Sequence, residues 1–93
     1  MNKPPLDFAK VESVRKHMLL TKAQMARLIG VSRVAYHGWL LGGPIRPSND
    51  EAVRSALRQC VHAIRTLGWP KPEVRGMTQK ARFALLLDQL NQS

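Results

Sequence analysis

The side chains best suited to chemistry lie in and around residues 21–39, and they suit binding more than bond-breaking. Arg33 is able to donate two hydrogen bonds to the O6 and N7 atoms of a guanine, and the charge of Lys22 is able to neutralise a phosphate. No Asp or Glu occurs between Glu12 and Asp50, although the same stretch contains six basic residues. These are Arg15, Lys16, Lys22, Arg27, Arg33 and Arg46. Together with a net charge of +9, this acid-free window indicates a nucleic acid partner more than a merely solvated surface.

Catalytic and metal-binding chemistry is poorly represented in the sequence. The chain has only six carboxylates, and most of them fall at expected helix starts or on helix surfaces. His17, His37 and His62 are not spaced as metal ligands, and none lies beside an obvious nucleophile. The single cysteine, Cys60, falls on an apolar helix stripe, which indicates a buried thiol and excludes an intrachain disulfide. We therefore expect no enzymatic activity, no metal and no cofactor.

Two short helices joined by a tight turn are expected to position the basic residues. Thr21 is a good N-cap for a first helix over residues 22–29, which is rich in strong helix formers. Gly30 follows and suits a left-handed turn, and Ser32 is placed to cap a second helix over residues 33–41. Helix, glycine turn, cap and helix at this spacing are typical of a helix-turn-helix.

At this point the segment resembles a known family, the lambda-repressor-like, Cro-type helix-turn-helix proteins. The resemblance covers about Val11 to Gly43, under half of the chain. It rests on the small residue Ala26, the turn glycine Gly30, the cap Ser32, the inward aromatics Tyr36 and Trp39, and the glycine after the second helix, which is matched by Gly42 or Gly43. The resemblance implies an all-α fold, a compact bundle of about five helices, whose residues 33–41 form a recognition helix.

The expected DNA contacts follow from this register together with the basic residues nearby. Val34 would contact a thymine methyl group, and His37 would meet a base edge or a phosphate. Gly38 either lets the helix approach the groove closely or accommodates a neighbouring helix. The full expected set is Thr21, Lys22, Ser32, Arg33, Val34, His37, Gly38, Arg46 and Arg15.

Two residues depart from the family pattern. The family often has a glutamate directly after the last aromatic residue of the recognition helix, paired with an arginine in the helix before the helix-turn-helix. Here Leu40 holds the glutamate position while Arg15 matches the arginine, so Arg15 is expected to lack its usual partner and to be free for a phosphate. Tyr36 is larger than the aliphatic residue usual at its site, and its hydroxyl needs a partner or an exit to solvent.

The remaining elements are expected to complete the bundle. Residues 1–5 form an arm that carries Lys3, and a first helix runs from Leu6 or Asp7 to about Leu19. A long helix starts at a capping box of Ser48 and Glu51 and ends near Leu67, with an apolar stripe that includes Val61. Arg54, Arg58 and Arg65 share another side of this helix, either as a solvated face or as a second phosphate-contacting or partner-facing stripe. A last helix, capped by Thr78, runs to about Leu90.

The last helix has a broader apolar edge than a terminal helix needs for one-sided packing. Its apolar residues either close the core or supply half of a dimer interface, and the two prolines Pro70 and Pro72 favour a helix that stands off the core. We therefore predict a DNA-binding domain over residues 1–69, and a linker with a dimerisation helix over residues 70–93. The predicted interface consists of Phe83, Leu86, Leu87 and Leu90.

These expectations combine into a sequence-specific transcriptional regulator of phage or plasmid type. It would bind an inverted repeat in double-stranded DNA as a homodimer, in the cytoplasm of a bacterium or of a phage-infected cell. No stretch approaches the ~20 continuous apolar residues of a membrane span, so no membrane partner is expected. The alternatives are a small terminase-like DNA-packaging subunit, and an antitoxin whose terminal helix binds a toxin.

Overall fold

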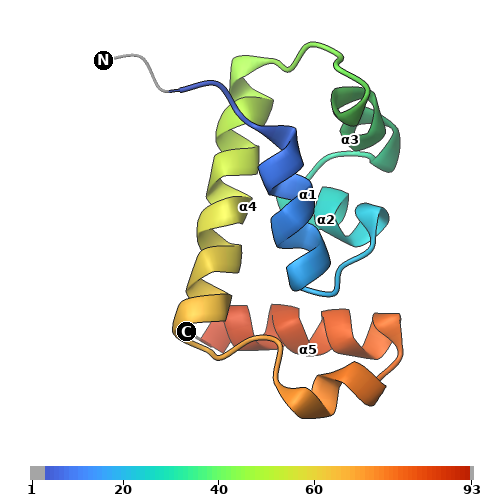
Figure 1. Cartoon of the computed structure of the whole chain (residues 1–93), viewed down its shortest axis with the longest axis vertical. Coiled ribbons are helices and arrows are strands. Elements are labelled where there is room, and N and C mark those ends of the chain that lie inside the picture. The colour runs from blue at the N-terminus through green and yellow to red at the C-terminus, as the bar shows by residue number, and fades with distance from the viewer. Residues whose placement is uncertain (1–3, 93) are drawn as a thin grey trace.

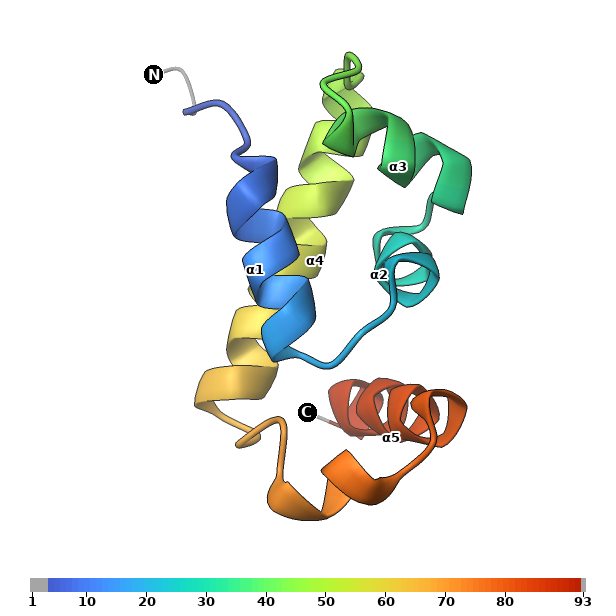
Figure 2. The ribbon, with the colours of Figure 1, turned by 45° about the vertical axis from the view of Figure 1, so that its right-hand side comes forward.

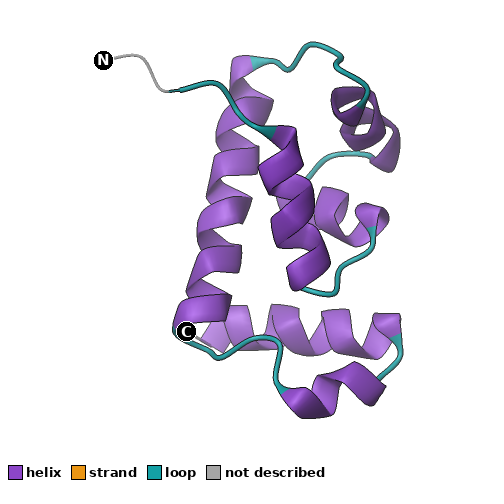
Figure 3. Cartoon of the chain, in the orientation of Figure 1, coloured by secondary structure: helices purple, strands orange, loops and turns teal. Residues whose placement is uncertain are grey.

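Five α-helices and one 3₁₀ turn make up the part of the chain that the structure describes, residues 4–92 of a computed structural model. They are α1 (Phe8–His17), α2 (Lys22–Ile29), α3 (Arg33–Leu40), α4 (Pro47–Arg65), the 3₁₀ turn η1 (Pro72–Gly76) and α5 (Gln79–Gln92). No strand occurs among these residues (Figure 3). The predicted all-α class is therefore confirmed. The arm residue Lys3 lies outside the described residues.

The helices pack around one apolar core. The long helix α4 lies alongside α1, with α2 and α3 on the other side of α1, and α5 crosses below them (Figures 1 and 2). Residues from each of the five helices, from η1 and from the segment between α4 and η1 contribute fully or almost fully buried side chains to this core. Among them are Val11, Met25, Tyr36, Trp39, Val53, Cys60, Trp69, Val74, Phe83 and Leu86. The buried Cys60 and the inward Tyr36 and Trp39 agree with the sequence-based expectation.

Local capping explains where most helices begin. Thr21 Oγ1 accepts a hydrogen bond from the Gln24 backbone N–H at 3.0 Å, and the Gln24 side chain accepts one from the Thr21 N–H at 3.0 Å. This reciprocal pair satisfies two donors at the start of α2 that would otherwise be unpaired. Ser32 caps α3 because its Oγ accepts a hydrogen bond from the Ala35 backbone N–H at 3.0 Å. The predicted caps Thr21 and Ser32 are therefore confirmed.

The predicted start of α4 is wrong. The helix begins at Pro47, Arg46 is its N-cap residue, and no side chain caps it, so Ser48 and Glu51 form no capping box. Proline suits the first helical position because the N–H that it lacks would have no partner there. The predicted stripe is also corrected, because Val61 is 38 % exposed while Ala63 is fully buried.

The C-terminal helix belongs to the core of the protomer. Phe83 and Leu86 of α5 are 5 % and 0 % exposed, and Val74 of η1 is buried with them. These two predicted interface residues are therefore not available on the surface, which corrects that part of the dimer prediction. Leu87 and Leu90 are only partly buried against the same core. The core consequently includes residues from both of the predicted parts of the chain, the DNA-binding domain over residues 1–69 and the C-terminal part over residues 70–93.

Candidate nucleic-acid interface

A tight turn of three residues sets the relation between α2 and α3. Gly30 adopts a left-handed conformation with φ +97°, which a residue with a Cβ adopts only under strain. The backbone N–H groups of Gly30 and Val31 both donate to the carbonyl of Ala26 at 2.9 Å. Ser32 then starts α3. The geometry of this corner therefore follows from residues within or next to it, as the sequence predicted.

One face of α3 is exposed to solvent and carries both polar and apolar side chains. The opposite face carries two aromatic side chains that are buried in the core. Arg33, Val34 and His37 are exposed, and Val34 is 82 % exposed. On the opposite side Tyr36 and Trp39 are buried, with an edge-to-face ring contact of 6.4 Å between centroids. The exposed residues are three of those predicted to meet DNA, and they lie on one short helix that its buried aromatics hold in place.

Gly38 lies in the second half of α3, and nothing would be within 4 Å of a Cβ atom built there. Accommodation of a neighbouring helix is therefore not the reason for glycine at this position. Close approach of α3 to a groove remains the prediction. By contrast, a Cβ on Gly43 would lie 2.8 Å from the Gly38 carbonyl oxygen, to which the Gly43 N–H donates at 2.9 Å. Glycine at position 43 is thus needed to close the end of α3.

A partly buried polar network, which the sequence did not predict, links α1 to α3. Arg15 donates to both carboxylate oxygens of Glu12, at 2.6 and 2.9 Å, and to the carbonyl of Leu20 at 2.8 Å. The Tyr36 hydroxyl donates to the same carboxylate at 2.7 Å. The prediction that Arg15 is free for a phosphate is therefore wrong. Glu12 is the partner of Arg15 in this structure, and its spacing of three residues from Arg15 was the signal available in the sequence.

These contacts shift the ionisation of the groups involved. The hydrogen bonds from Arg15, followed by that from Tyr36, hold the pKa of Glu12 below its ordinary value although burial acts in the opposite direction. Burial, together with the bond to Glu12, raises the pKa of the Tyr36 hydroxyl. At neutral pH the carboxylate is therefore ionised and the phenol is protonated. In these states one acceptor can serve both donors.

The first prediction concerns this network. Glu12→Gln removes the charge that compensates Arg15, so we expect the free energy of unfolding to fall by about 1–3 kcal/mol at neutral pH. Because the pKa of Glu12 is lowered on folding, the wild-type advantage is present above the unfolded-state pKa and is lost as pH falls through the folded-state pKa. Urea denaturation from pH 3 to pH 8 measures this. Glu73→Gln, the same change at an exposed position, is the control, and equal losses in both variants would contradict the prediction.

Three successive carbonyl groups of the α1–α2 linker accept hydrogen bonds from side chains. The indole N–H of Trp69 donates to Met18 at 2.9 Å, and the guanidinium of Arg82 in α5 donates to Leu19 at 3.4 Å. Arg15 serves Leu20, as described above. Leu19 has φ +62°, a left-handed conformation that is costly for a leucine. The linker that leads into the Thr21 cap is therefore held largely by residues of the C-terminal part of the chain.

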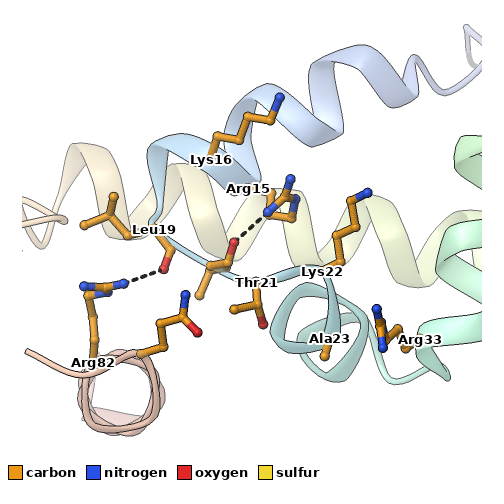
Figure 4. A pocket seen from close by; sticks show the side chains of 10 residues that line it. Arg15, Lys16, Leu19, Thr21, Lys22, Ala23, Arg33 and Arg82 are labelled. Atoms are coloured by element: carbon orange, nitrogen blue, oxygen red, sulfur yellow. Dashed lines mark hydrogen bonds between the residues drawn. The ribbon is translucent and has the colours of Figure 1, made fainter.

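A basic hollow lies in front of this linker, and Figure 4 shows the side chains around it. Its volume is about 730 Å³, and α1, α2, α3 and α5 each contribute to its walls. The lining residues are Arg15, Lys16, Leu19, Leu20, Thr21, Lys22, Ala23, Arg33, Gln79 and Arg82. Five of these residues are cationic and none is acidic. The predicted contacts Thr21, Lys22 and Arg33 are thus brought together at one site, whereas Gln79 and Arg82 were not expected there.

The remaining basic residues are arranged differently. Arg46 is exposed at the N-cap position of α4, outside the hollow. On α4, Arg54 pairs with Asp50 at 2.6 Å and Arg58 pairs with Glu51 at 3.0 Å, while Arg65 is exposed. Two of the three arginines of this stripe are therefore paired along their own helix. The basic hollow, by contrast, brings together cationic residues from α1, α2, α3 and α5 with no acidic residue in its lining.

Comparison with known proteins found no matching family model, no matching curated protein and no matching solved structure. In the described residues, no helix is both long and apolar enough to cross a membrane.

Proposed function

We propose that this protein is a sequence-specific DNA-binding transcriptional regulator that inserts α3 into the major groove. One observation carries this proposal. The exposed face of α3 presents Arg33 and His37 with the bare apolar side chain of Val34, while the opposite face is anchored in the core by Tyr36 and Trp39. A rigid helix with hydrogen-bond donors and an exposed methyl-bearing side chain suits the edges of base pairs in the major groove.

The residues around α3 divide into two roles. Arg33 reads a guanine, Val34 contacts a thymine methyl group and His37 meets a base edge, while Gly38 allows close approach. A second set holds the sugar–phosphate backbone, and such contacts orient the protein without reading sequence. This set consists of Thr21, Lys22, Ser32 and Arg46.

A homodimer on an inverted repeat is part of the proposal. A single short reading helix contacts few base pairs, so useful specificity needs two of them on one DNA, in major grooves about 34 Å apart. Because Phe83 and Leu86 are buried, the dimer surface on α5 reduces to its partly exposed apolar residues, of which Leu87 and Leu90 were predicted.

The second prediction separates base reading from backbone binding. Arg33→Ala is expected to cost about 1–3 kcal/mol on the preferred site and to relax preference at one base pair. Lys22→Ala is expected to weaken binding to all sequences about equally. The measurement is selection of bound duplexes from a random pool, followed by titration of the selected and scrambled sites. If Arg33→Ala selects the same motif as the wild type, α3 does not read DNA in this register.

The same preparation tests the two alternative functions. A dimer that selects a palindrome supports the regulator. A ring of eight or more subunits would indicate a packaging subunit of terminase type, and a co-purifying toxin would indicate an antitoxin.

A further inference from the structure

One wall of the basic hollow is formed by residues of the C-terminal helix α5, and the proposed function gives this wall no role. The sequence assigned α5 to dimerisation, yet Gln79 and Arg82 of α5 line the hollow together with Lys22 and Arg33. The backbone of α5 is also attached to α2 there, because the side chain of Gln24 donates to the carbonyl of Gln79 at 3.0 Å. The start of α5 is thus placed next to the proposed DNA-binding helices.

Most of the positive charge of the hollow is not paired with a carboxylate within the described part of the protein. Of its five cationic residues only Arg15 forms an ion pair with a carboxylate there. Among residues 4–92, the hydrogen bonds of Arg82 go to neutral carbonyl oxygens, those of Val74, Met77 and Leu19, at 3.3–3.4 Å. Its Nε atom is buried and has no hydrogen-bond partner. Positive charges gathered in this way around a concave surface attract an anion.

The position of Arg33 identifies the anion. This residue belongs both to the reading face of α3 and to the wall of the hollow. A duplex whose major groove receives α3 must therefore carry one of its backbone strands past the hollow, where Lys16 and Lys22 are also placed (Figure 4). A phosphodiester group is the anion that such a strand brings to the site.

We propose that the hollow between α1, α2, α3 and the start of α5 binds a phosphate of the DNA backbone, and that α5 forms one wall of this site. This inference rests on the proposed function. The C-terminal helix is then part of the nucleic-acid interface of its own protomer. It contributes the charge of Arg82 and the side chain of Gln79 to the site, and it holds the linker in front of Thr21.

The third prediction tests the α5 wall by charge reversal at Gln79. Gln79→Glu places a carboxylate in the hollow, and its helix position is favourable because an acidic residue in the first turn of a helix interacts well with the helix dipole. We expect this variant to bind the selected duplex about tenfold more weakly, and Gln79→Lys to bind it several-fold more tightly. Fluorescence anisotropy with the selected duplex and with a scrambled duplex measures both effects, which should be equal on the two DNAs.

Gln59→Glu and Gln59→Lys are the matched controls, because they make the same changes in net charge at an exposed site on α4 outside the hollow. We expect less than about a twofold effect from each of them. If the Gln79 variants behave like the Gln59 variants while Arg33→Ala still weakens binding, the phosphate site is wrong and the proposed function stands. If both Gln79 variants weaken binding, the position acts through local structure and the phosphate site is also wrong. If the wild type binds no duplex DNA, both proposals fail.

Discussion

Replacement of Leu86 by glutamate is expected to unfold the protein instead of releasing a folded monomer. Leu86 is 0 % exposed, so the variant loses the burial of a large apolar side chain and places a carboxylate among apolar groups. We expect a loss of about 4 kcal/mol or more in the free energy of unfolding, which is a large part of the stability of a small domain. Urea denaturation followed by circular dichroism measures this loss.

Ala84→Glu is the control for this experiment, because position 84 lies on the same helix but is exposed. We expect a change within about 0.5 kcal/mol there, as for ordinary surface substitutions. Sedimentation of the Leu86→Glu variant decides between the two roles of Leu86. A folded, stable monomer would show that Leu86 is a dimer-interface residue, contrary to its packing in the core.

Binding to duplex DNA is expected to weaken by about 10³- to 10⁵-fold when salt rises from 50 to 200 mM. The acid-free window and the basic hollow predict several phosphate contacts per protomer, or about six to ten per dimer, and each contact releases counterions when it forms. The logarithm of the binding constant should then fall with the logarithm of salt at a slope of about −5 to −9. Anisotropy titrations at five salt concentrations measure this slope.

Substitutions that each remove one positive charge show which basic residues make the phosphate contacts responsible for this slope. Lys16→Ala removes a cation that lines the hollow, so we expect the slope to become less steep by about 0.9 for each copy of the chain bound. Arg65→Ala removes an equal charge from the exposed end of α4, away from α3 (Figure 1), and should leave the slope unchanged. A wild-type slope near zero would remove the electrostatic basis of the proposed function.

The two helices of the proposed reading unit could be predicted from sequence because their determinants are local. A cap such as Thr21 or Ser32 bonds to a backbone group three residues away, and Gly30 adopts a conformation that its own lack of a side chain permits. The inward position of Tyr36 and Trp39 follows from helical periodicity in the same segment. None of these features depends on how distant parts of the chain pack.

The start of α4 was mispredicted although it too is local. Ser48 and Glu51 have the spacing of a capping box, but Pro47 precedes them and is itself well suited to the first helical position. Two local preferences for the start of the helix therefore competed within five residues, and the sequence pattern alone did not show which of them would prevail.

Tertiary structure decided the role of α5 and completed the network around Arg15, although the Glu12–Arg15 pair itself is local to α1. Arg15 is not free for a phosphate because its partner Glu12 lies one turn before it on α1, and Tyr36 from α3 completes the network. The apolar edge of α5 is compatible both with a core and with an interface, because burial against the same chain and against a second copy needs the same side chains. Only the path of the chain after Trp69, which brings Phe83, Leu86 and Arg82 against the first four helices, distinguishes the two.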